Sequence, residues 1–378
     1  MKIGIDLRPF LRHETGVGTY IKNLLFSLSN IDMENDYYLF SSSLKQRFSA
    51  SKIPIINKMH FRDFHYPVKL LNFFWYRLGW PPLDSFFKTE LDLTHSPTPL
   101  ICPTKGKTII TIHDLFFMDF PYMANREARK FFYKNIHKSL QASDGVIVVS
   151  NCIKKQILDR FEINKEKIKV IYHGVDSEFT SDISLEEIKN FRRSHSLLSR
   201  VIVFVGAMDP RKNLLNLIKA FKIVHSKQTD VSLVIAGRRG RDYLALKKAV
   251  KNNDLQSWVK ILDYLSLREL KRLYRVGTIF AFPSYCEGFG LPLLEAMISE
   301  MPVVASNRTA LPEIAGEAAL YFNPEKPEEI AAALLKLLEN NGLREKFIEL
   351  GKKRAKEFDW GKTAKNTLSF YHKIYEEK

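Results

Sequence analysis

The chain has 378 residues, of which 45% are hydrophobic, and a formal net charge of +16. This length favours two domains, and the hydrophobic fraction is that of a globular protein with sizeable cores. Its three cysteines are far apart and match neither a disulfide framework nor a zinc site, which suits a reducing compartment. No apolar run approaches the roughly 18–20 residues that span a bilayer. No signal peptide precedes the first expected strand, so we expect a cytoplasmic protein that is at most peripheral on the inner face of the membrane.

The excess of positive charge has more than one interpretation. No recognised nucleic-acid-binding motif occurs, so nucleic acid is not an expected partner. The charge fits an anionic membrane surface, and it fits equally a basic surface that only water contacts.

Short apolar runs alternate with helical patterns along the chain, which predicts an α/β protein with parallel sheets. The strands expected first are residues 3–7, 37–40, 91–95, 108–112, 146–149 and 169–172, followed by 201–205, 232–236, 259–262, 278–282, 302–305 and 319–322. A polar stretch, 177–199, precedes the strand at Val201. We therefore expect domains at 1–176 and 177–359 and a final helix at 360–378.

Two segments of the first half carry candidate ligand groups. Gly16 and Gly18 form an expected loop between the first strand and a helical pattern, but a third glycine is missing, so this is weaker than a dinucleotide fingerprint. A tight turn without a ligand is the alternative. His113 follows the strand at 108–112, and ligands in such sheets bind beyond the carboxyl ends of the strands. A histidine satisfied by local backbone bonds is the alternative there, and Asp114 could cap a helix.

Residues 70–80 are unusually aromatic, and residues 125–138 have the pattern of a basic amphipathic helix. Arg126, Lys130, Lys134 and Lys138 recur at every fourth position. Such helices can lie on anionic membranes. The alternative is that the aromatic residues belong to the core of the first domain and the cations face water.

In the second half, Gly206, Arg211 and Lys212 follow the strand at 201–205 and open a helical pattern. Two adjacent cations at this position could face a pyrophosphate and stabilise the charge that grows on it when a bond to it breaks. Solvated side chains at a helix start are the alternative. Arg238 and Tyr264 follow the next two expected strands and could reach the same site.

The most informative segment is residues 283–296, in which Glu287 and Glu295 bracket the sequence Gly-Phe-Gly-Leu-Pro. An apolar strand precedes it, and Pro292 suits the first turn of a helix. Backbone N–H groups at a helix start attract an anion, and carboxylates beside them can accept hydrogen bonds from sugar hydroxyls. The segment therefore indicates a nucleotide-sugar site. A pair of glutamates eight positions apart would otherwise more often be two solvated helix residues, and Cys286 is interpreted as a small loop residue rather than a nucleophile.

This Glu-x7-Glu segment, followed by Pro302-Val303-Val304-Ala305-Ser306, resembles the donor site of the retaining glycosyltransferases of family GT4. The resemblance extends over almost the whole chain. It implies the GT-B fold: two Rossmann-like domains that face each other across a cleft, with the acceptor on the first, the nucleotide-sugar mostly on the second, and a last helix that crosses back. The chain departs from the family at Ala207, where many members carry arginine.

The resemblance also assigns roles. Lys212 matches the family's catalytic lysine, Glu295 would bind the ribose, and Glu287 would contact the donor sugar. The implied catalytic residues are His113, Arg211, Lys212 and Glu287. The implied donor-binding residues are Gly16, Gly18, Gly206, Arg238, Tyr264, Gly288, Phe289, Gly290, Leu291 and Glu295.

The implied activity is retaining transfer of a hexose, with mannose from GDP-mannose as the expected donor, to a glycan or lipid-linked acceptor in surface polysaccharide synthesis. No Asp-x-Asp metal motif stands in the expected loop, so neither a metal nor a bound cofactor is expected. Three alternatives stay open: a non-hydrolysing nucleotide-sugar epimerase of the same fold, a nicotinamide-dependent oxidoreductase, and a non-catalytic nucleotide-sugar-binding protein.

Overall fold

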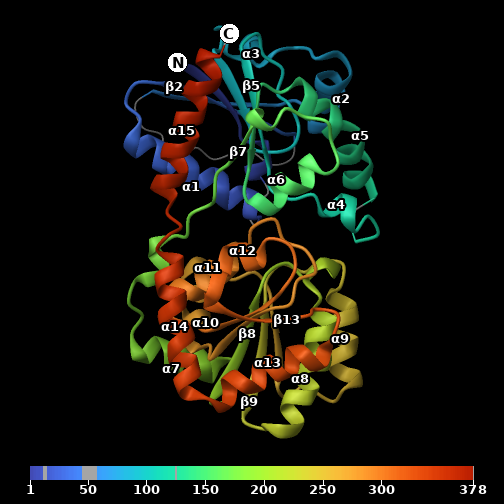
Figure 1. Cartoon of the computed structure of the whole chain (residues 1–378), viewed down its shortest axis with the longest axis vertical. Helices are drawn as coiled ribbons and strands as arrows, with labels where there is room; N and C mark the ends of the chain where they lie inside the picture. The colour runs from blue at the N-terminus through green and yellow to red at the C-terminus, as the bar shows by residue number, and fades with distance from the viewer. Residues whose placement is uncertain (12–14, 45–57, 124–125, 378) are drawn as a thin grey trace. The chain divides into compact units, whose positions relative to one another are not determined.

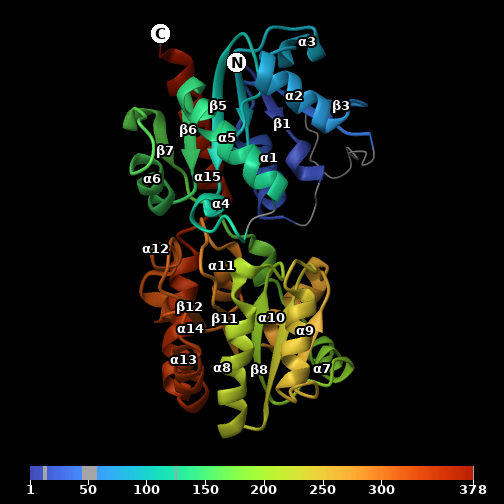
Figure 2. The same ribbon diagram turned by 90° about the vertical axis from the view of Figure 1, so that its right-hand side faces the viewer.

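The computed structural model describes residues 1–11, 15–44, 58–123 and 126–377. The chain forms two compact units, one made of Met1–Gly174 with Asp359–Lys378 and the other of Val175–Phe358. Each unit is a parallel β-sheet with helices on both faces (Figures 1 and 2). The two parallel sheets confirm the expected α/β fold class.

The sheet of the first unit has the strand order β3-β2-β1-β4-β5-β6-β7, and all of its pairs are parallel. Its strands are β1 Lys2–Asp6, β2 Asp36–Ser42, β3 Met59–Phe64, β4 Leu93–Ser96, β5 Lys107–Ile112, β6 Gly145–Val148 and β7 Ile168–Val170. Its helices are α1 Gly16–Ile31, α2 Val68–Leu78, α3 Leu83–Phe87, α4 Phe116–Asp119, α5 Arg126–Ala142, α6 Asn151–Leu158 and α15 Trp360–Glu376.

The sheet of the second unit has the order β10-β9-β8-β11-β12-β13, again with parallel pairs throughout. Its strands are β8 Arg200–Val205, β9 Val231–Ala236, β10 Val259–Leu262, β11 Ile279–Phe282, β12 Val303–Ser306 and β13 Ala319–Phe322. Its helices are α7 Leu185–Ser194, α8 Leu214–Lys227, α9 Tyr243–Asn252, α10 Leu267–Val276, α11 Leu291–Ile298, α12 Leu311–Ala315, α13 Pro327–Glu339 and α14 Asn341–Ala355.

Strand β3 is the one described strand that no apolar run predicted. It contains His60, Arg62 and Asp63, and it lies at the edge of its sheet, where it pairs with β2 alone. An edge strand has one open side and tolerates polar residues there. The hydrophobic pattern by which the other strands were predicted is therefore absent from it.

Helix α15 belongs to the first unit although it lies at the far end of the chain (Figure 1). It packs along α1, and its Tyr371 and Ile374 side chains are buried. Burial of such a side chain stabilises the fold by roughly 1.5–3 kcal/mol. Helix α15, from the end of the chain, is therefore part of the same hydrophobic core as α1, from its beginning.

In each sheet the strand order reverses at one point, between β1 and β4 in the first unit and between β8 and β11 in the second. Open parallel sheets bind ligands at the carboxyl ends of the strands beside this point, because the loops there diverge and leave a crevice. The residues that follow β8 and β11 are therefore the first place to look for a site.

Candidate active site

The loops after β8 and β11 bring three charged side chains together in the second unit. Lys212 Nζ lies 2.5 Å from Glu287 Oε1, and Arg211 Nη1 lies 2.7 Å from Glu287 Oε2. Lys212 and Glu287 are buried. The two cations share one carboxylate, so the cluster keeps a net charge of +1. We call Arg211, Lys212 and Glu287 the charged cluster.

The electrostatics of this cluster keep the carboxylate ionised. Burial alone would raise the pKa of Glu287, but the charges of Arg211 and Lys212 outweigh it and lower that pKa to about 2. Lys212 Nζ also lies 4.9 Å from the centre of the Phe282 ring, a distance at which a cation is attracted to the face of the ring. The cations are therefore held in place before any ligand arrives.

Hydrogen bonds fasten the β8 loop to the β11 loop. The Tyr285 N–H donates to the carbonyl oxygen of Arg211 at 2.8 Å. Asn213 has a left-handed backbone (φ 58°) and its side-chain amide donates to the carbonyls of Pro283 and Pro324. Buried amides of this kind need partners, so Asn213 fixes the turn that aims Lys212 at the carboxylate.

A third loop, after β12, supports Glu287 from the other side. The Glu287 N–H donates to Thr309 Oγ1 at 3.0 Å, and the Ala310 N–H donates to the Glu287 carbonyl at 3.3 Å. Thr309 itself has a positive φ of 54°. The backbone of Glu287 is thus fixed by residues 20 or more positions away in sequence.

Gly206 and Gly237 end β8 and β9 where the two backbones approach closely. A Cβ at Gly237 would lie 2.1 Å from the Gly206 carbonyl oxygen. Both residues have a positive φ, 143° at Gly237 and 154° at Gly206. Only glycine fits such a contact without moving the backbone. Gly237 therefore has a packing requirement that is independent of any ligand, and at Gly206 the positive φ favours glycine in the same way.

The segment 288–291 leads from the charged cluster into α11. Gly288, Phe289 and Gly290 are buried, Gly290 has φ 106°, and Leu291 begins the helix. Pro292 lies in the first turn, as predicted. The helix start adds partial positive charge beside the cluster, because its first N–H groups have no partner within the helix.

Glu295 lies one turn into α11 and differs from Glu287 in its surroundings. Tyr274 of α10 donates a hydrogen bond from its hydroxyl to Glu295 Oε2 at 2.9 Å. Burial raises the pKa of Glu295 to about 7, with the charge of Asp176 adding to the rise and the Tyr274 hydrogen bond opposing it. This carboxyl group titrates near neutral pH, whereas Glu287 stays ionised.

Arg238 and Tyr264 follow β9 and β10, farther from the strand-order reversal. The Arg238 guanidinium lies 3.8 Å from Asp209 and is half exposed, and Tyr264 is also exposed. The structure therefore places these two predicted donor-binding residues on the same edge of the sheet as the charged cluster, but at a more open part of it.

His113 follows β5 in the first unit and lies within a cluster of neutral rings. Its Nδ1 is 3.3 Å from Nε2 of His173, and its Nε2 is 3.2 Å from the Pro97 carbonyl oxygen. The Tyr20 ring lies 4.9 Å from both histidines, and Trp360 stacks on His173. Burial lowers the pKa of His113 to about 4 and that of His173 well below its usual value. Both rings are thus uncharged at neutral pH.

The pattern of bonds around His113 defines its tautomer. A carbonyl oxygen only accepts hydrogen bonds, so His113 donates to Pro97 from Nε2–H and accepts from His173 at Nδ1. One of these two bonds is to the backbone, as the alternative interpretation of this histidine expects, and the other is to a side chain. We call His113, His173 and Tyr20 the neutral cluster.

The predicted glycine loop at Gly16 and Gly18 is wrong in one respect. Helix α1 already begins at Gly16, and its N-cap Thr15 accepts a hydrogen bond from the Gly18 N–H at 3.1 Å. A threonine cap satisfies an N–H that a helix start leaves open, so the helix begins at Gly16 and includes both glycines. Tyr20 of the neutral cluster lies one turn farther on.

Several supporting residues were not predicted from the sequence. His173 lies directly before Gly174, the last residue of the Met1–Gly174 segment. Tyr274 lies within the amphipathic helix α10. A histidine at the end of β7 was a usable signal, because strand ends carry ligand groups. Nothing in the sequence around Tyr274 or Thr309 indicates their partners.

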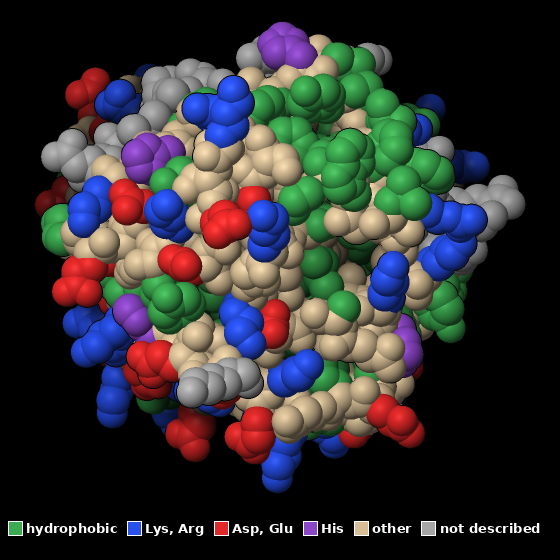
Figure 3. Space-filling view, turned by 90° about the horizontal axis from the view of Figure 1, so that it is seen from above, with side chains coloured by type: hydrophobic (Ala, Val, Ile, Leu, Met, Phe, Trp, Pro, Cys, Tyr) green, Lys and Arg blue, Asp and Glu red, His purple; other side chains and the backbone are tan. Residues whose placement is uncertain are grey.

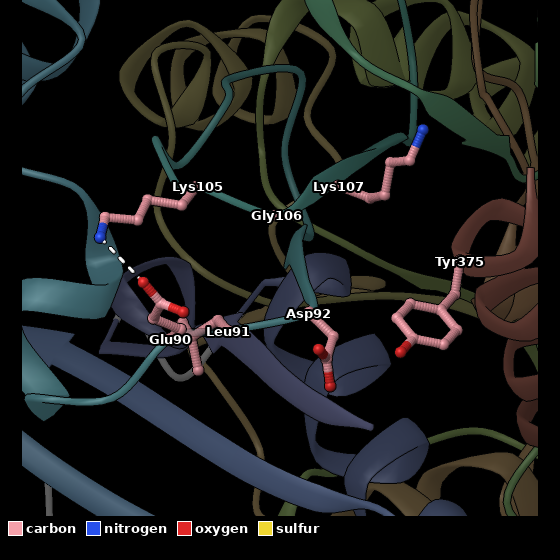
Figure 4. Close-up of a pocket in the computed structure, with 7 residues that line it drawn as sticks. All are labelled: Glu90, Leu91, Asp92, Lys105, Gly106, Lys107 and Tyr375. Atoms are coloured by element: carbon pink, nitrogen blue, oxygen red, sulfur yellow. Dashed lines mark hydrogen bonds and ion pairs between the residues drawn. The ribbon is translucent and has the colours of Figure 1, made fainter. Parts of the chain in front are cut away.

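A hollow of about 400 Å³ lies elsewhere on the first unit (Figure 4). It is bordered by Glu90, Asp92, Lys105 and Lys107 at the starts of β4 and β5, and by Tyr375 of α15. Glu90 and Lys105 form an exposed ion pair there at 2.9 Å. This is the amino end of the sheet, opposite to the end at which such sheets bind ligands, so we assign it no part in the site.

Within the described residues, no three His, Cys, Asp or Glu side chains gather as metal ligands. The independence from metal therefore stays a prediction.

Two family models cover most of the chain between them. The model described as "Glycosyl transferases group 1" matches residues 187–354, and the model described as "Glycosyltransferase Family 4" matches residues 15–179. The chain belongs to the glycosyltransferases that these two models describe, as its motifs predicted.

Individual relatives agree with this family. O-antigen chain mannosyltransferase B of Escherichia coli is 27% identical over 278 residues, which make up 73% of this chain and 73% of that protein. "Uncharacterized glycosyltransferase MJ1607" of Methanocaldococcus jannaschii is 32% identical over 246 residues, 63% of this chain and 61% of that protein.

Solved structures share the fold at low identity. Sucrose-phosphate synthase from Thermosynechococcus elongatus superposes with a TM-score of 0.77 and 17% identity over 100% of both chains. Anabaena Alr3699/HepE, solved in complex with UDP-glucose, superposes with a TM-score of 0.75 and 16% identity over 99% of this chain and 100% of that one. These similarities confirm the GT-B fold.

Proposed function

We propose that this glycosyltransferase retains anomeric configuration and transfers a hexose from a nucleotide-sugar, with mannose from GDP-mannose as the preferred donor. The acceptor is a glycan or a lipid-linked sugar of surface polysaccharide synthesis. The observation that carries the proposal is the charged cluster at the strand-order reversal of the second sheet: two preorganised cations on one carboxylate, beside a helix start.

The cations supply what the chemistry needs. When the glycosidic bond of the donor breaks, negative charge grows on the β-phosphate of the departing nucleoside diphosphate. A fixed cation near that oxygen lowers the barrier, and a charge pair at 4 Å contributes on the order of 4 kcal/mol at an effective dielectric of 20. Lys212 and Arg211 fill this role, and neither has to be ordered first because Glu287 already holds both.

Glu287 has a second role in this proposal. Its pKa of about 2 keeps it ionised, so its oxygens can accept hydrogen bonds from hydroxyls of the donor sugar once phosphate oxygens take over part of the cations' bonding. The amides of Gly288, Phe289 and Gly290 hold the sugar or its phosphate. Glu295 accepts from the ribose hydroxyls.

The proposal needs no metal, because Arg211 and Lys212 supply the positive charge that a divalent ion would otherwise bring. Activity that persists in EDTA supports this part. Activity that disappears in EDTA and returns with Mg²⁺ or Mn²⁺ contradicts it.

The choice of mannose is supported by the name of a relative, a mannosyltransferase that matches 73% of this chain. A neighbour with the same fold was solved with UDP-glucose, so the two donors form a direct comparison. A bound donor stabilises the folded state by mass action, about 2.7 kcal/mol at 100 times its Kd. GDP-mannose should therefore raise the melting temperature more than UDP-glucose at equal concentration.

The activity itself is tested by incubation of the protein with the stabilising donor, with and without lipid-linked acceptors, followed by NMR of the product. We expect transfer only with an acceptor, and an anomeric centre with the configuration of the donor. Conversion of the donor alone into its epimer indicates an epimerase instead. Stabilisation by a donor without any transfer or hydrolysis indicates a non-catalytic binding protein.

A further inference from the structure

Helix α2 exposes large apolar side chains in addition to the apolar residues that it buries. Such a helix normally buries one apolar stripe and exposes polar residues. Here Leu71 and Trp75 are buried, yet the segment also exposes large apolar side chains: Tyr66 (50%), Leu70 (50%), Phe73 (57%), Leu78 (62%) and Trp80 (62%). We call these five residues the α2 patch. Exposed apolar groups that gather in this way mark an interaction surface.

The segment that carries the α2 patch contains basic residues and no acidic ones. Lys69 and Arg77 lie on the same helix and are exposed, and residues 64–83 contain no aspartate or glutamate. Asp84, the next acidic residue, is buried and accepts hydrogen bonds from the Leu91 N–H and the Thr104 hydroxyl. The outer surface of the segment is therefore apolar and positive at once.

Helix α5 extends the positive charge. Lys138 donates a hydrogen bond to the carbonyl oxygen of Tyr76, which places the second half of α5 beside the end of α2. Lys134 and Tyr133 are exposed on α5. Arg126 and Lys130 of the predicted basic stripe have side chains outside the described part of the chain. A shallow hollow of about 180 Å³ lies between the two helices, with Gly79 and Asn135 on its border.

Figure 3 shows this end of the first unit with the apolar side chains drawn in green. They form one broad area on the side where Figure 1 draws α2 and α3, with Lys and Arg side chains along its border and Asp and Glu outside it. Within the described residues, no helix is long and apolar enough to cross a membrane. A surface of this kind can dock onto a membrane without spanning it.

The composition discriminates between a protein partner and a lipid surface. Protein interfaces are depleted in lysine. Helices that lie in a membrane interface combine lysine and arginine with Trp, Phe and Leu that insert into the headgroup boundary. Tryptophan and tyrosine, like Trp80 and Tyr66, favour that boundary because their rings are apolar and their tips are polar. The net charge of the whole chain, +16, acts in the same direction.

We propose that the α2 patch, with Lys69, Arg77, Lys134 and Lys138, docks the protein onto an anionic bilayer surface. The inference goes beyond the proposed glycosyl transfer and does not depend on it. Each exposed cation near an anionic surface strengthens binding by about fivefold, and the inserted apolar side chains supply the part of the affinity that salt does not screen.

The test is flotation of the full-length protein with two kinds of vesicle, neutral phosphatidylcholine alone or the same lipid mixed with an anionic phosphatidylglycerol fraction. We expect recovery with the anionic vesicles, less with neutral ones, and a decrease as salt is raised. Two variants probe the two components: Phe73→Ser for insertion, and Lys69→Glu with Arg77→Glu for charge. Each should lower the partition coefficient at least about tenfold.

Helix α9 of the second unit offers matched controls. Leu244 there is 76% exposed, and Lys248 and Lys251 are exposed. Leu244→Ser and the pair Lys248→Glu with Lys251→Glu change the same chemistry and the same net charge at another surface, and we expect wild-type flotation from both. Circular dichroism and the melting temperature show that each variant is folded.

Three results would overturn the proposal: equal recovery with neutral and anionic vesicles, variants of α2 that float like the wild type, or controls that lose as much binding as the α2 variants. A concentration-dependent dimer that Phe73→Ser abolishes, without flotation of the wild type, would instead assign the patch to self-association.

Discussion

The two units carry clusters of opposite character. Both clusters lie at the carboxyl ends of parallel strands. The charged cluster holds two cations and one ionised carboxylate, whereas the neutral cluster holds two uncharged histidines between aromatic rings. The same fold therefore supports an ionic site in one sheet and a hydrogen-bonding site without charge in the other.

The difference suits the two parts of glycosyl transfer. A departing diphosphate gains negative charge and needs fixed cations. A sugar hydroxyl is uncharged and needs donors and acceptors in defined directions. If the charged cluster serves the diphosphate and the neutral cluster a hydroxyl, changes in the two clusters should differ in size and in pH dependence.

The largest effect is expected from Glu287→Gln. It leaves Lys212 and Arg211 without their countercharge, and removal of one partner of a buried pair typically costs about 3–5 kcal/mol. Urea unfolding measures this loss. Glu295→Gln, which removes no ion pair, serves as the control and should cost far less. Equal losses from the two variants would show that the charged cluster contributes no more to stability than an ordinary hydrogen bond.

The same carboxylate has a defined pH signature. Its folded-state pKa is lowered to about 2, so the stability it contributes is present above the ordinary value of about 4.5 and is lost as the pH falls towards 2. The wild type should lose this stability over that window, and Glu287→Gln should not show this component.

Lys212→Ala is expected to lower turnover by roughly 10²–10³ at saturating donor, the usual loss when one transition-state donor is removed. Glu287 keeps Arg211 as its partner in this variant, so the fold should survive. Lys248→Ala, an exposed lysine of the same unit, controls for charge alone. Turnover near the wild-type value in Lys212→Ala would exclude the lysine from the reaction.

Glu295 should make donor binding depend on pH. Its pKa is raised to about 7, and only the ionised carboxylate accepts hydrogen bonds from both ribose hydroxyls. Donor affinity should therefore rise about tenfold between pH 6 and pH 8, since one proton must leave for binding. Titration calorimetry in buffers of different ionisation heat measures that proton. In Glu295→Gln both the proton release and the pH dependence should disappear; if they persist, another group titrates.

The smallest effect is expected in the neutral cluster. His173→Phe removes the donor to His113 Nδ1, a bond worth about 0.5–1.5 kcal/mol, and should lower turnover a few-fold. His173→Gln keeps a donor and should restore part of it. Steady-state kinetics of both variants distinguishes orientation of His113 from general packing, because a packing role would favour the ring of Phe over Gln.

Much of this arrangement could be predicted from the sequence, because it depends on short segments whose strands and loops can be recognised from their own residues. The apolar runs before Arg211 and Glu287 are buried strands, and loops after such strands meet at one edge of a sheet. The prediction of a nucleotide-sugar site needed only those loops and their residue types. Strand β3 was missed because it lies at an edge and has polar residues.

The parts that sequence did not predict are contacts between distant segments. Thr309 bonds to the Glu287 backbone, and Tyr274 bonds to Glu295 across two helices. The sequence around neither residue indicates which partner it bonds to. Gly16 and Gly18 lie in helix α1 rather than in the expected loop, because Thr15 caps the helix just before them. The catalytic and donor-binding roles stay predictions until the variants are measured.

Helix α15 has a practical consequence for anyone who wishes to divide this protein. Its Tyr371 hydroxyl forms a hydrogen bond with the buried His95 of β4 at 2.6 Å. A fragment that stops at Gly174 would lack this helix, would expose part of its hydrophobic core and should aggregate. A fragment of residues 175–358 corresponds to the whole second unit, of which α15 is not a part. Chimeras that exchange the first unit between relatives should therefore carry residues 359–378 together with the first 174.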